Sequence, residues 1–279
     1  MTLNRYSSFQ TMTVRAIPRT PQEVLALLQA GLPLPPADFY RFNFSHADLP
    51  GADLRQAKLI GANFNGANLT QADLRGTDLR GADFRGTMLK GANLQGACLY
   101  RADLSGADLR EANLADIKLK VARYDGQTLF PEGFPYKSCG AIGPGANLNG
   151  APLNTANLRE IDLRGASLLG AYLTGADLTG GNLQGARLSS ADLRKAFLTG
   201  ASLRQVRLNG ANLTGTDLRA ADLTDVEFET LESIAGADFT AAQGLNEGLR
   251  SRLLSYPAQE LDTWNSFTRR TTRTSLEIL

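Results

Sequence analysis

The sequence predicts an all-β fold in which the backbone turns a corner every five residues and coils around a narrow interior. Three observations lead to this prediction. A large apolar residue recurs at every fifth position, alanine stands two residues before most of these centres, and glycine commonly precedes the alanine. The pattern fills two arrays, residues 37–124 and 146–240, separated by an interruption at 125–145.

The two arrays repeat with little variation. In the first, the centres run from Phe39 to Tyr124, and all 18 of them are Leu, Phe or Tyr. Alanine stands two residues before the centre in 14 of these repeats, and Asp or Asn stands directly before it in 13. The second array has 17 centres from Leu148 to Phe228, of which 16 are leucine. This strict recurrence predicts that every centre occupies the same kind of interior position.

A five-residue period fits neither of the common regular elements. On an α-helix, five residues at about 100° each would rotate the apolar position by about 140° per repeat, so no apolar face would form. On a straight strand, an odd period would send successive centres to opposite faces. A corner in every repeat removes both conflicts, and glycines such as Gly61 and Gly66 stand where a tight turn needs a small residue. The Asp or Asn of each repeat is expected to accept hydrogen bonds from nearby backbone amides.

The repeat A(D/N)LxG, seen as ADL at 52–54 and ANL at 211–213, resembles the consensus of the pentapeptide-repeat proteins. The motif FPEGF at 130–134 is similar to loops of cyanobacterial, HetL-like members. The resemblance implies a right-handed, four-sided parallel β-helix with four repeats per coil and about nine coils. It says little about function, since one fold serves many roles.

Four repeats per coil imply that residues 20 positions apart stack about 4.8 Å from each other. The centres Phe44, Phe64, Phe84, Leu104 and Tyr124 are spaced in this way, so we expect one interior column rich in aromatic rings. Each buried leucine should contribute about 2 kcal/mol to the free energy of unfolding, so the stack should be stable without disulfides.

A short capping α-helix is expected at the N-terminal end of the stack, where unpaired strand edges would otherwise associate. It falls in the segment 1–36. Thr20, followed by Pro21 and Glu23, has the pattern of a capping box, and an apolar helix over 24–29 should follow.

A second capping helix is expected in the C-terminal segment 241–279. Residues 245–254 predict it, with Asn246 as a possible N-cap and leucines on one side. Beyond this helix the sequence has no period, and we interpret residues 256–279 as a tail.

Residues 125–145, DGQTLFPEGFPYKSCGAIGPG, contain the candidate partner-binding loop. The flanking centres are 24 residues apart, four more than one coil, so the segment should replace a turn of wall and bulge outward on a continuous axis. Two rods joined by a linker are the alternative. Three rings, Phe130, Phe134 and Tyr136, with three prolines, predict an ordered loop. The rings either form an exposed epitope or pack on the wall.

No catalytic set is recognisable, and we predict that the protein is not an enzyme. His46, the only histidine, falls at a corner without Cys or carboxylate partners at ligand spacing, so no metal site is expected. Cys98 precedes a centre and should face solvent with no base beside it. Residues 140–145 are glycine-rich but lack the lysine and the helix of a phosphate loop. No cofactor is expected.

The balance of acidic and basic residues in the two arrays limits the class of partner that the protein can bind. Residues 37–124 carry 10 acidic and 12 basic side chains, and residues 146–228 carry eight of each. The resemblance implies an alternative function, DNA mimicry against type II topoisomerases such as gyrase, but that role would need a strongly negative rod. We therefore predict a non-catalytic interaction or scaffolding rod, an intracellular regulatory protein that binds an unidentified protein partner and neither nucleic acid nor membrane.

The setting predicted from the sequence is cytoplasmic. Two cysteines are too few for a disulfide framework and favour a reducing compartment. Residues 1–18 contain neither an apolar signal region nor a cleavage motif, and no stretch approaches the roughly 18 apolar residues of a membrane span. A monomer is favoured over an oligomer.

Overall fold

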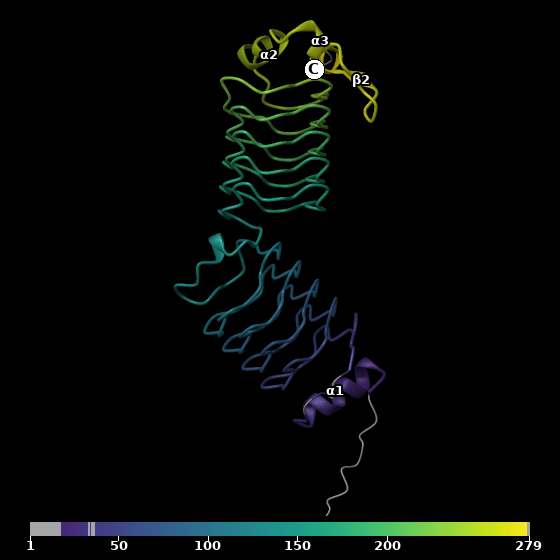
Figure 1. The fold of residues 1–279 in the computed structure, drawn as a ribbon, viewed down its shortest axis with the longest axis vertical. Coiled ribbons are helices and arrows are strands. Elements are labelled where there is room, and N and C mark those ends of the chain that lie inside the picture. The colour runs from purple at the N-terminus through teal and green to yellow at the C-terminus, as the bar shows by residue number, and fades with distance from the viewer. Residues whose placement is uncertain (1–17, 33, 35–36, 278–279) are drawn as a thin grey trace, which may run out of the picture.

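The computed structural model describes residues 18–32, 34 and 37–277. Within them the chain forms two successive stacks of coils, with helices at both outer ends (Figure 1). The stacks meet near residue 145, where the ribbon in Figure 1 passes from the lower, blue stack to the upper, green one and the direction of stacking changes.

The walls of each coil are single parallel β-bridges between residues 20 positions apart. Asp53 pairs with Asp73. The amide of Leu54 donates to the carbonyl O of Asp73 at 2.8 Å, and the amide of Asp73 donates to the carbonyl O of Ala52 at 2.9 Å. Because the bridge recurs once per repeat and joins every fourth repeat, four repeats make one coil.

The corner residue of each repeat adopts the left-handed conformation. Gly66 has a φ of 65°, and a Cβ there would fall 2.6 Å from Nδ1 of His46, so a larger residue at this corner would displace the His46 ring. Other residues occupy the same conformation elsewhere, among them Gln56 at 58°. The residue before the centre supports the turn, as the sequence predicts: the amide of Asn65 donates to Oδ1 of Asn63 at 2.9 Å.

The centres and the small residues two positions before them fill the interior. Phe44, Phe64 and Phe84 are at most 1% exposed, and consecutive ring centroids in this column lie 5.1 Å apart. The rings are nearly parallel, at 19° and 8°. Leu104 and Tyr124 lie further along the same 20-residue spacing and are also buried.

Threonine replaces alanine at three buried interior positions, and each hydroxyl is satisfied. Thr87 Oγ1 donates to the carbonyl O of Phe64 at 2.8 Å, and Thr216 Oγ1 donates in the same way to Leu193 at 2.8 Å. A buried hydroxyl without a partner would be costly. The carbonyl groups of the preceding coil therefore allow threonine in an otherwise apolar interior.

Two walls carry β-bridges toward the junction between the stacks. On one, Ile142 pairs with Arg123, and the amide of Gly145 donates to the carbonyl O of Arg164 at 2.8 Å. On the next, the amide of Leu109 donates to the carbonyl O of Leu129 at 2.7 Å. These bonds extend the first stack, and the first of the two walls runs through to the second stack.

The other two walls have no β-bridge at the junction, and on one of them the amide of Val121 still donates to the carbonyl O of Gly140 at 2.8 Å. Among the residues that the structure describes, no bridge extends beyond Asn113 or Lys118 in the first stack, and none precedes Pro152 or Asn157 in the second. This differs from the continuous axis expected from the sequence. The reason is that residues 130–139 fold into a loop, which contains the 3₁₀ helix η1 (Tyr136–Ser138), instead of supplying wall. The change of direction in Figure 1 lies at this gap.

Helix α1 (Pro21–Gln29) lies at the N-terminal end of the first stack (Figure 1). Thr20 Oγ1 accepts the amide of Glu23 at 3.2 Å, which is the N-cap bond that the sequence predicts. Val24 and Leu28 are buried and belong to the same apolar core as the coils. The helix therefore packs its apolar side on the first coil.

The C-terminal segment is folded throughout its described part. Helix α2 (Glu247–Leu254) begins after Asn246, whose Oδ1 accepts the amide of Leu249 at 2.9 Å, as predicted. The residues interpreted as a tail, whose order the sequence left open, form further elements. These elements are α3 (Ala258–Leu261), β1 (Trp264–Asn265), its antiparallel partner β2 (Arg270–Thr271) and α4 (Thr272–Glu277).

Contacts with the last coil explain why the tail folds. Thr272 Oγ1 donates to the carbonyl O of Ile234 at 2.9 Å, and Ser275 Oγ accepts the amide of Phe239 at 3.0 Å. Leu276 is fully buried. These groups satisfy the edge of the final coil, and their partners lie more than 30 positions earlier in the chain.

Two carboxylates are buried at this end of the rod, and only one of them has an arginine partner. Asp217 and Asp238 pair in the ladder and are 2% and 1% exposed. Arg219 donates to both oxygens of Asp217, at 2.8 and 2.7 Å. Burial raises the pKa of Asp217, but these hydrogen bonds outweigh it and leave the pKa below its usual value. Oδ2 of Asp238 meets no donor among the described residues.

Asp238→Asn is expected to leave the free energy of unfolding unchanged or to raise it by up to about 1 kcal/mol, because it removes a buried charge that has no ion pair of its own, and Oδ1 can still accept the two hydrogen bonds from Thr240. The new amide can donate to Asp217, as Nδ2 of Asn68 donates to Asp48 one coil away at 2.7 Å. Asp217→Asn should lower the free energy of unfolding by about 1–2 kcal/mol, because it weakens the bonds to Arg219. Urea titration compares the two variants, and equal destabilisation by both would contradict this account.

Candidate interaction surfaces

The three rings predicted as a partner-binding loop form a compact cluster around Tyr124. Phe130 stacks on Tyr136 with ring centroids 4.6 Å apart and on Phe134 at 5.7 Å. Tyr124 meets Phe130 and Tyr136 edge-on, at 5.6 and 5.4 Å. All three loop rings are half-buried. The structure therefore brings the three residues together at the end of the aromatic column and leaves part of each ring accessible.

Burial keeps the polar groups of this ring cluster neutral. The hydroxyl of Tyr124 donates to the carbonyl O of Pro144 at 2.9 Å, and burial raises the pKa of Tyr124 far above its ordinary value. Sγ of Cys139 donates to the carbonyl O of Tyr136 at 3.0 Å, and burial raises the pKa of this thiol. Neither group is suited to act as a nucleophile at neutral pH.

An open cleft of about 590 Å³ lies where the two stacks meet, and the bridged residues Arg123 and Ile142 are part of its lining. Nη2 of Arg123 donates to the carbonyl O of Asn157 from one stack to the other. Sequence reasoning did not find this cleft, because it depends on how the interruption folds. The first stack lines it with Tyr100, Arg101, Asp103, Val121 and Arg123, and the second with residues 152–158.

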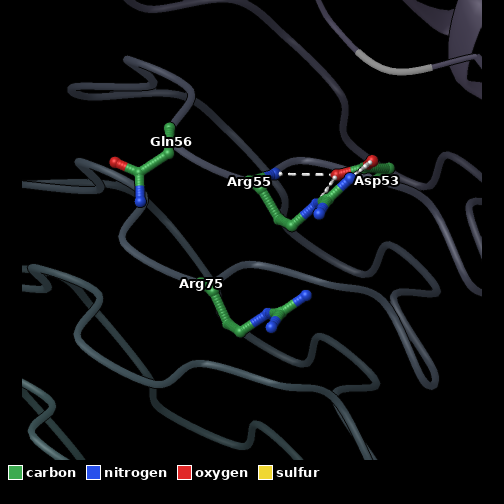
Figure 2. A pocket seen from close by; sticks show the side chains of 4 residues that line it. All are labelled: Asp53, Arg55, Gln56 and Arg75. Carbon is green, nitrogen blue, oxygen red and sulfur yellow. Dashed lines mark hydrogen bonds and ion pairs between the residues drawn. The ribbon is translucent and has the colours of Figure 1, made fainter.

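Figure 2 shows a second, shallower hollow of about 480 Å³, lined by Asp53, Arg55, Gln56 and Arg75. Arg55 donates to Asp53 through Nε at 2.8 Å and through Nη2 at 2.6 Å, and this side-chain hydrogen bonding lowers the pKa of Asp53. Arg75 pairs in the same way with Asp73 in the next coil. The arginines and carboxylates are thus engaged with each other, which argues against acid–base chemistry here.

The Asp–Arg pair is a recurring element of the walls. The hydrogen bond from Arg194 lowers the pKa of Asp192 to about 2. A carboxylate with a depressed pKa remains ionised at neutral pH and cannot act as a general acid there. The same bidentate pairing occurs at Asp78, Asp83, Asp108, Asp162 and Asp217.

The hairpin of β1 and β2 places two aromatic rings on the outer surface of the second stack. Trp264 is 60% exposed and Phe267 is 61% exposed. Phe267 meets Phe197 of the wall edge-on, with centroids 5.0 Å apart. The aperiodic sequence of this segment offers no signal for the hairpin, which forms through contacts with the last coils.

The remaining residues singled out in the sequence lie apart from these surfaces. His46 is a corner residue with a φ of 56°, and Cys98 is a free, half-buried thiol on a wall. Across the described part of the chain, no three His, Cys, Asp or Glu side chains are grouped to hold a metal ion. None of the described helices is long and apolar enough to cross a bilayer.

The 20-residue ladder and the filled apolar interior define a β-solenoid repeat protein. A family model described as Pentapeptide repeats (8 copies) matches the chain at residues 37–76, 67–106, 92–120, 145–180, 156–194 and 186–225. The chain belongs to the pentapeptide-repeat family, and its coils form the right-handed quadrilateral β-helix of that family.

Several solved structures are similar to the chain. The pentapeptide repeat protein Rfr23 of the cyanobacterium Cyanothece 51142 is 40% identical over 34% of this chain and 65% of its own length, with a TM-score of 0.34. HetL of Nostoc sp. strain PCC 7120, involved in heterocyst differentiation regulation, is 28% identical over 81% of this chain and 93% of its own, with a TM-score of 0.27. QnrB1, a plasmid-mediated fluoroquinolone resistance protein, is 24% identical over 69% of this chain and 82% of its own length, with a TM-score of 0.24. No curated protein matches the chain significantly.

Proposed function

We propose that the protein is a non-catalytic interaction or scaffolding rod, an intracellular regulatory protein that binds a protein partner. The packing of the interior supports this most directly. Centres such as Leu74, Leu94 and Leu183 are 0% exposed, so side chains occupy the axis of both stacks and the outer walls carry the surface available to a ligand. A rigid wall also loses little conformational entropy when it binds.

We also propose how the rod is divided and closed. About nine coils, the number expected from the repeats, would be covered by α1 at one end and by α2 with the elements after it at the other. The buried side chains of Val24 and Leu253 support these roles, because each helix packs an apolar residue on the core. The proposed segments are 1–36, 37–124, 125–145, 146–240 and 241–279.

The working environment is proposed to be the cytoplasm, with the chain as a monomer. Cys98 and Cys139 are both free thiols, which suits a reducing compartment. The alternative of DNA mimicry against gyrase receives no support from the charges, since acidic and basic residues nearly balance in both arrays. Inhibition of gyrase supercoiling by the purified chain at micromolar concentration would reverse this view.

We infer that the aromatic loop takes part in partner contact through the accessible parts of Phe130, Phe134 and Tyr136. Phe134 lies at one end of the ring stack, so changing it disturbs Tyr124 least. Leu129, which is 43% exposed, extends the apolar surface beside the rings. A half-buried aromatic cluster of this kind offers contact area that is already ordered before binding.

Phe134→Ser is expected to lower partner recovery about tenfold, because it removes a ring worth about 1.5 kcal/mol of apolar contact. Tagged full-length chain is the bait for affinity capture, and quantitative mass spectrometry measures recovery. Phe267→Ser is the matched control, since it removes an exposed ring elsewhere. Equal recovery with both variants would reject the loop as a contact, and the absence of any specific partner with the unmodified chain would reject the interaction function.

A further inference from the structure

One wall of the first stack carries a positive charge that the balanced total conceals. The centres of this wall are every fourth one from Phe39 to Leu119. The residue before each centre and the two residues after it point outward, and they include six basic and two acidic side chains. Each of the other three walls of this stack carries two basic and two or three acidic side chains. We call this surface the basic wall; it comprises Arg41, Lys58, Arg80, Arg101, Lys118 and Lys120, with Asp38 and Asp78.

Most cations of the basic wall form no ion pair. Arg80 pairs with Asp78 at 2.7 Å, and the other five, all exposed, make no salt bridge to any residue that the structure describes. The opposite holds on the other walls of this stack. There, Arg123 donates to the carbonyl O of Asn157, and the remaining five cations, Arg55, Arg75, Arg85, Lys90 and Arg110, all pair with carboxylates.

The uncompensated charge concentrates near the cleft between the stacks. Lys58 is bridged on both sides by residues of opposite charge, Asp38 and Asp78. The next positions along the ladder are Cys98 and Lys118, so no carboxylate follows in that column. Arg101 and Arg123 line the cleft itself, where Asp103 is the one acidic residue of the lining. The positive potential therefore rises toward a concave surface, where low-dielectric walls strengthen it.

Apolar side chains alternate with the cations along the same surface. Tyr40 is 52% exposed, and Ile60, Tyr100 and Val121 are half-buried on the wall. Arg101 lies over the ring of Tyr100, 5.2 Å from its centroid. The surface thus offers both charge and apolar contact, and it continues into the cleft through Tyr100 and Val121.

We propose that the basic wall and the adjoining cleft form a docking site for an acidic, partly apolar segment of another protein. This rests on the proposed interaction function and specifies the chemistry of the partner. Two features favour a protein segment over a polyanion. Asp38 and Asp78 stand within the wall, where they would oppose a continuous row of phosphates. Ile60 and Val121 offer contacts that an apolar side chain uses and a phosphate backbone does not.

The test uses the full-length chain and a fluorescein-labelled peptide. Every second residue of the peptide is glutamate, and the residues between are serine or leucine. About eight residues suffice, because an extended peptide of that length spans the roughly 19 Å from the first to the fifth coil of the wall. The test variant combines Arg101→Glu, Lys118→Glu and Lys120→Glu. The matched control combines Lys90→Glu, Arg187→Glu and Lys195→Glu, which changes the net charge equally on other surfaces.

Fluorescence anisotropy should show that the test variant binds the peptide about tenfold more weakly, since each exposed ion pair contributes a few tenths of a kcal/mol to about 1 kcal/mol. The control should stay within about twofold of the unmodified chain, and binding should weaken with added salt. Thermal melts confirm that both variants fold. Equal affinities of the test and control variants would overturn the proposal, as would the absence of binding by the unmodified chain at millimolar peptide.

Two further measurements separate the alternatives. Tighter binding of a single-stranded oligonucleotide or of vesicles containing anionic lipid than of the peptide would overturn the assignment to a protein segment. In the capture experiment, loss of the partner with the test variant supports the proposal. Recovery of the partner with that variant but not with Phe134→Ser would leave the interaction function standing and reject the basic wall.

Discussion

Leu104→Asp is expected to unfold the first stack of coils. Leu104 is 1% exposed and belongs to the interior column between Phe84 and Tyr124. The substitution loses about 2 kcal/mol of apolar burial and places a carboxylate where no polar partner is at hand, which costs at least as much again. We therefore expect a loss of about 4 kcal/mol or more, measured by circular dichroism and urea titration.

Asn149→Asp is the matched control for this substitution, because it adds the same charge at an outward position. Oδ1 of Asn149 accepts Oγ of Ser167 at 2.7 Å and the amide of Leu169 at 3.0 Å, and a carboxylate retains both acceptor roles. The free energy of unfolding should change by less than about 0.5 kcal/mol. A Leu104→Asp protein that melts like the Asn149→Asp protein would show that the interior tolerates charge.

Features that depend on neighbours in the sequence could be predicted without coordinates. The turn bond from Asn65 to Asn63 and the N-caps Thr20 and Asn246 each involve residues two or three positions apart. A repeated local pattern of this kind also specifies which residues point inward, because every repeat turns in the same way. The burial of Phe44 and Phe64 follows from that regularity.

Features that depend on contacts between distant, non-repeating segments could not be predicted. Nothing in the period indicates that Thr272 would reach Ile234, or that the bulge at the interruption would break the bridge ladder on two walls. The basic wall is a different case. Its positive charges are offset in the net charge of the chain by acidic residues elsewhere. Sorting the outward residues by their position in the 20-residue coil would nevertheless have separated Arg101 and Lys118 from the paired cations.

Tyr124→Ala is expected to uncouple the two stacks. The ring of Tyr124 packs edge-on against Phe130 and Tyr136, and its hydroxyl donates to Pro144 at 2.9 Å. A Cβ on Gly143 would lie 2.6 Å from this ring, so the backbone of the junction closes directly on it. Truncation of such a buried ring costs about 3–5 kcal/mol.

Uncoupling follows because only the wall that contains Ile142 carries ladder hydrogen bonds through the junction in the described residues, so the ring cluster carries much of the contact between the stacks. In a linear repeat protein, stability is transmitted only through interfaces between neighbouring units. Calorimetry of Tyr124→Ala should therefore resolve two unfolding transitions, and hydrogen exchange should assign them to residues on either side of 145. Tyr124→Phe, which loses only the hydrogen bond, should cost about 1 kcal/mol and keep the transitions together. A single transition at the temperature of the unmodified chain in Tyr124→Ala would place the coupling in the wall that contains Ile142 instead of in the rings.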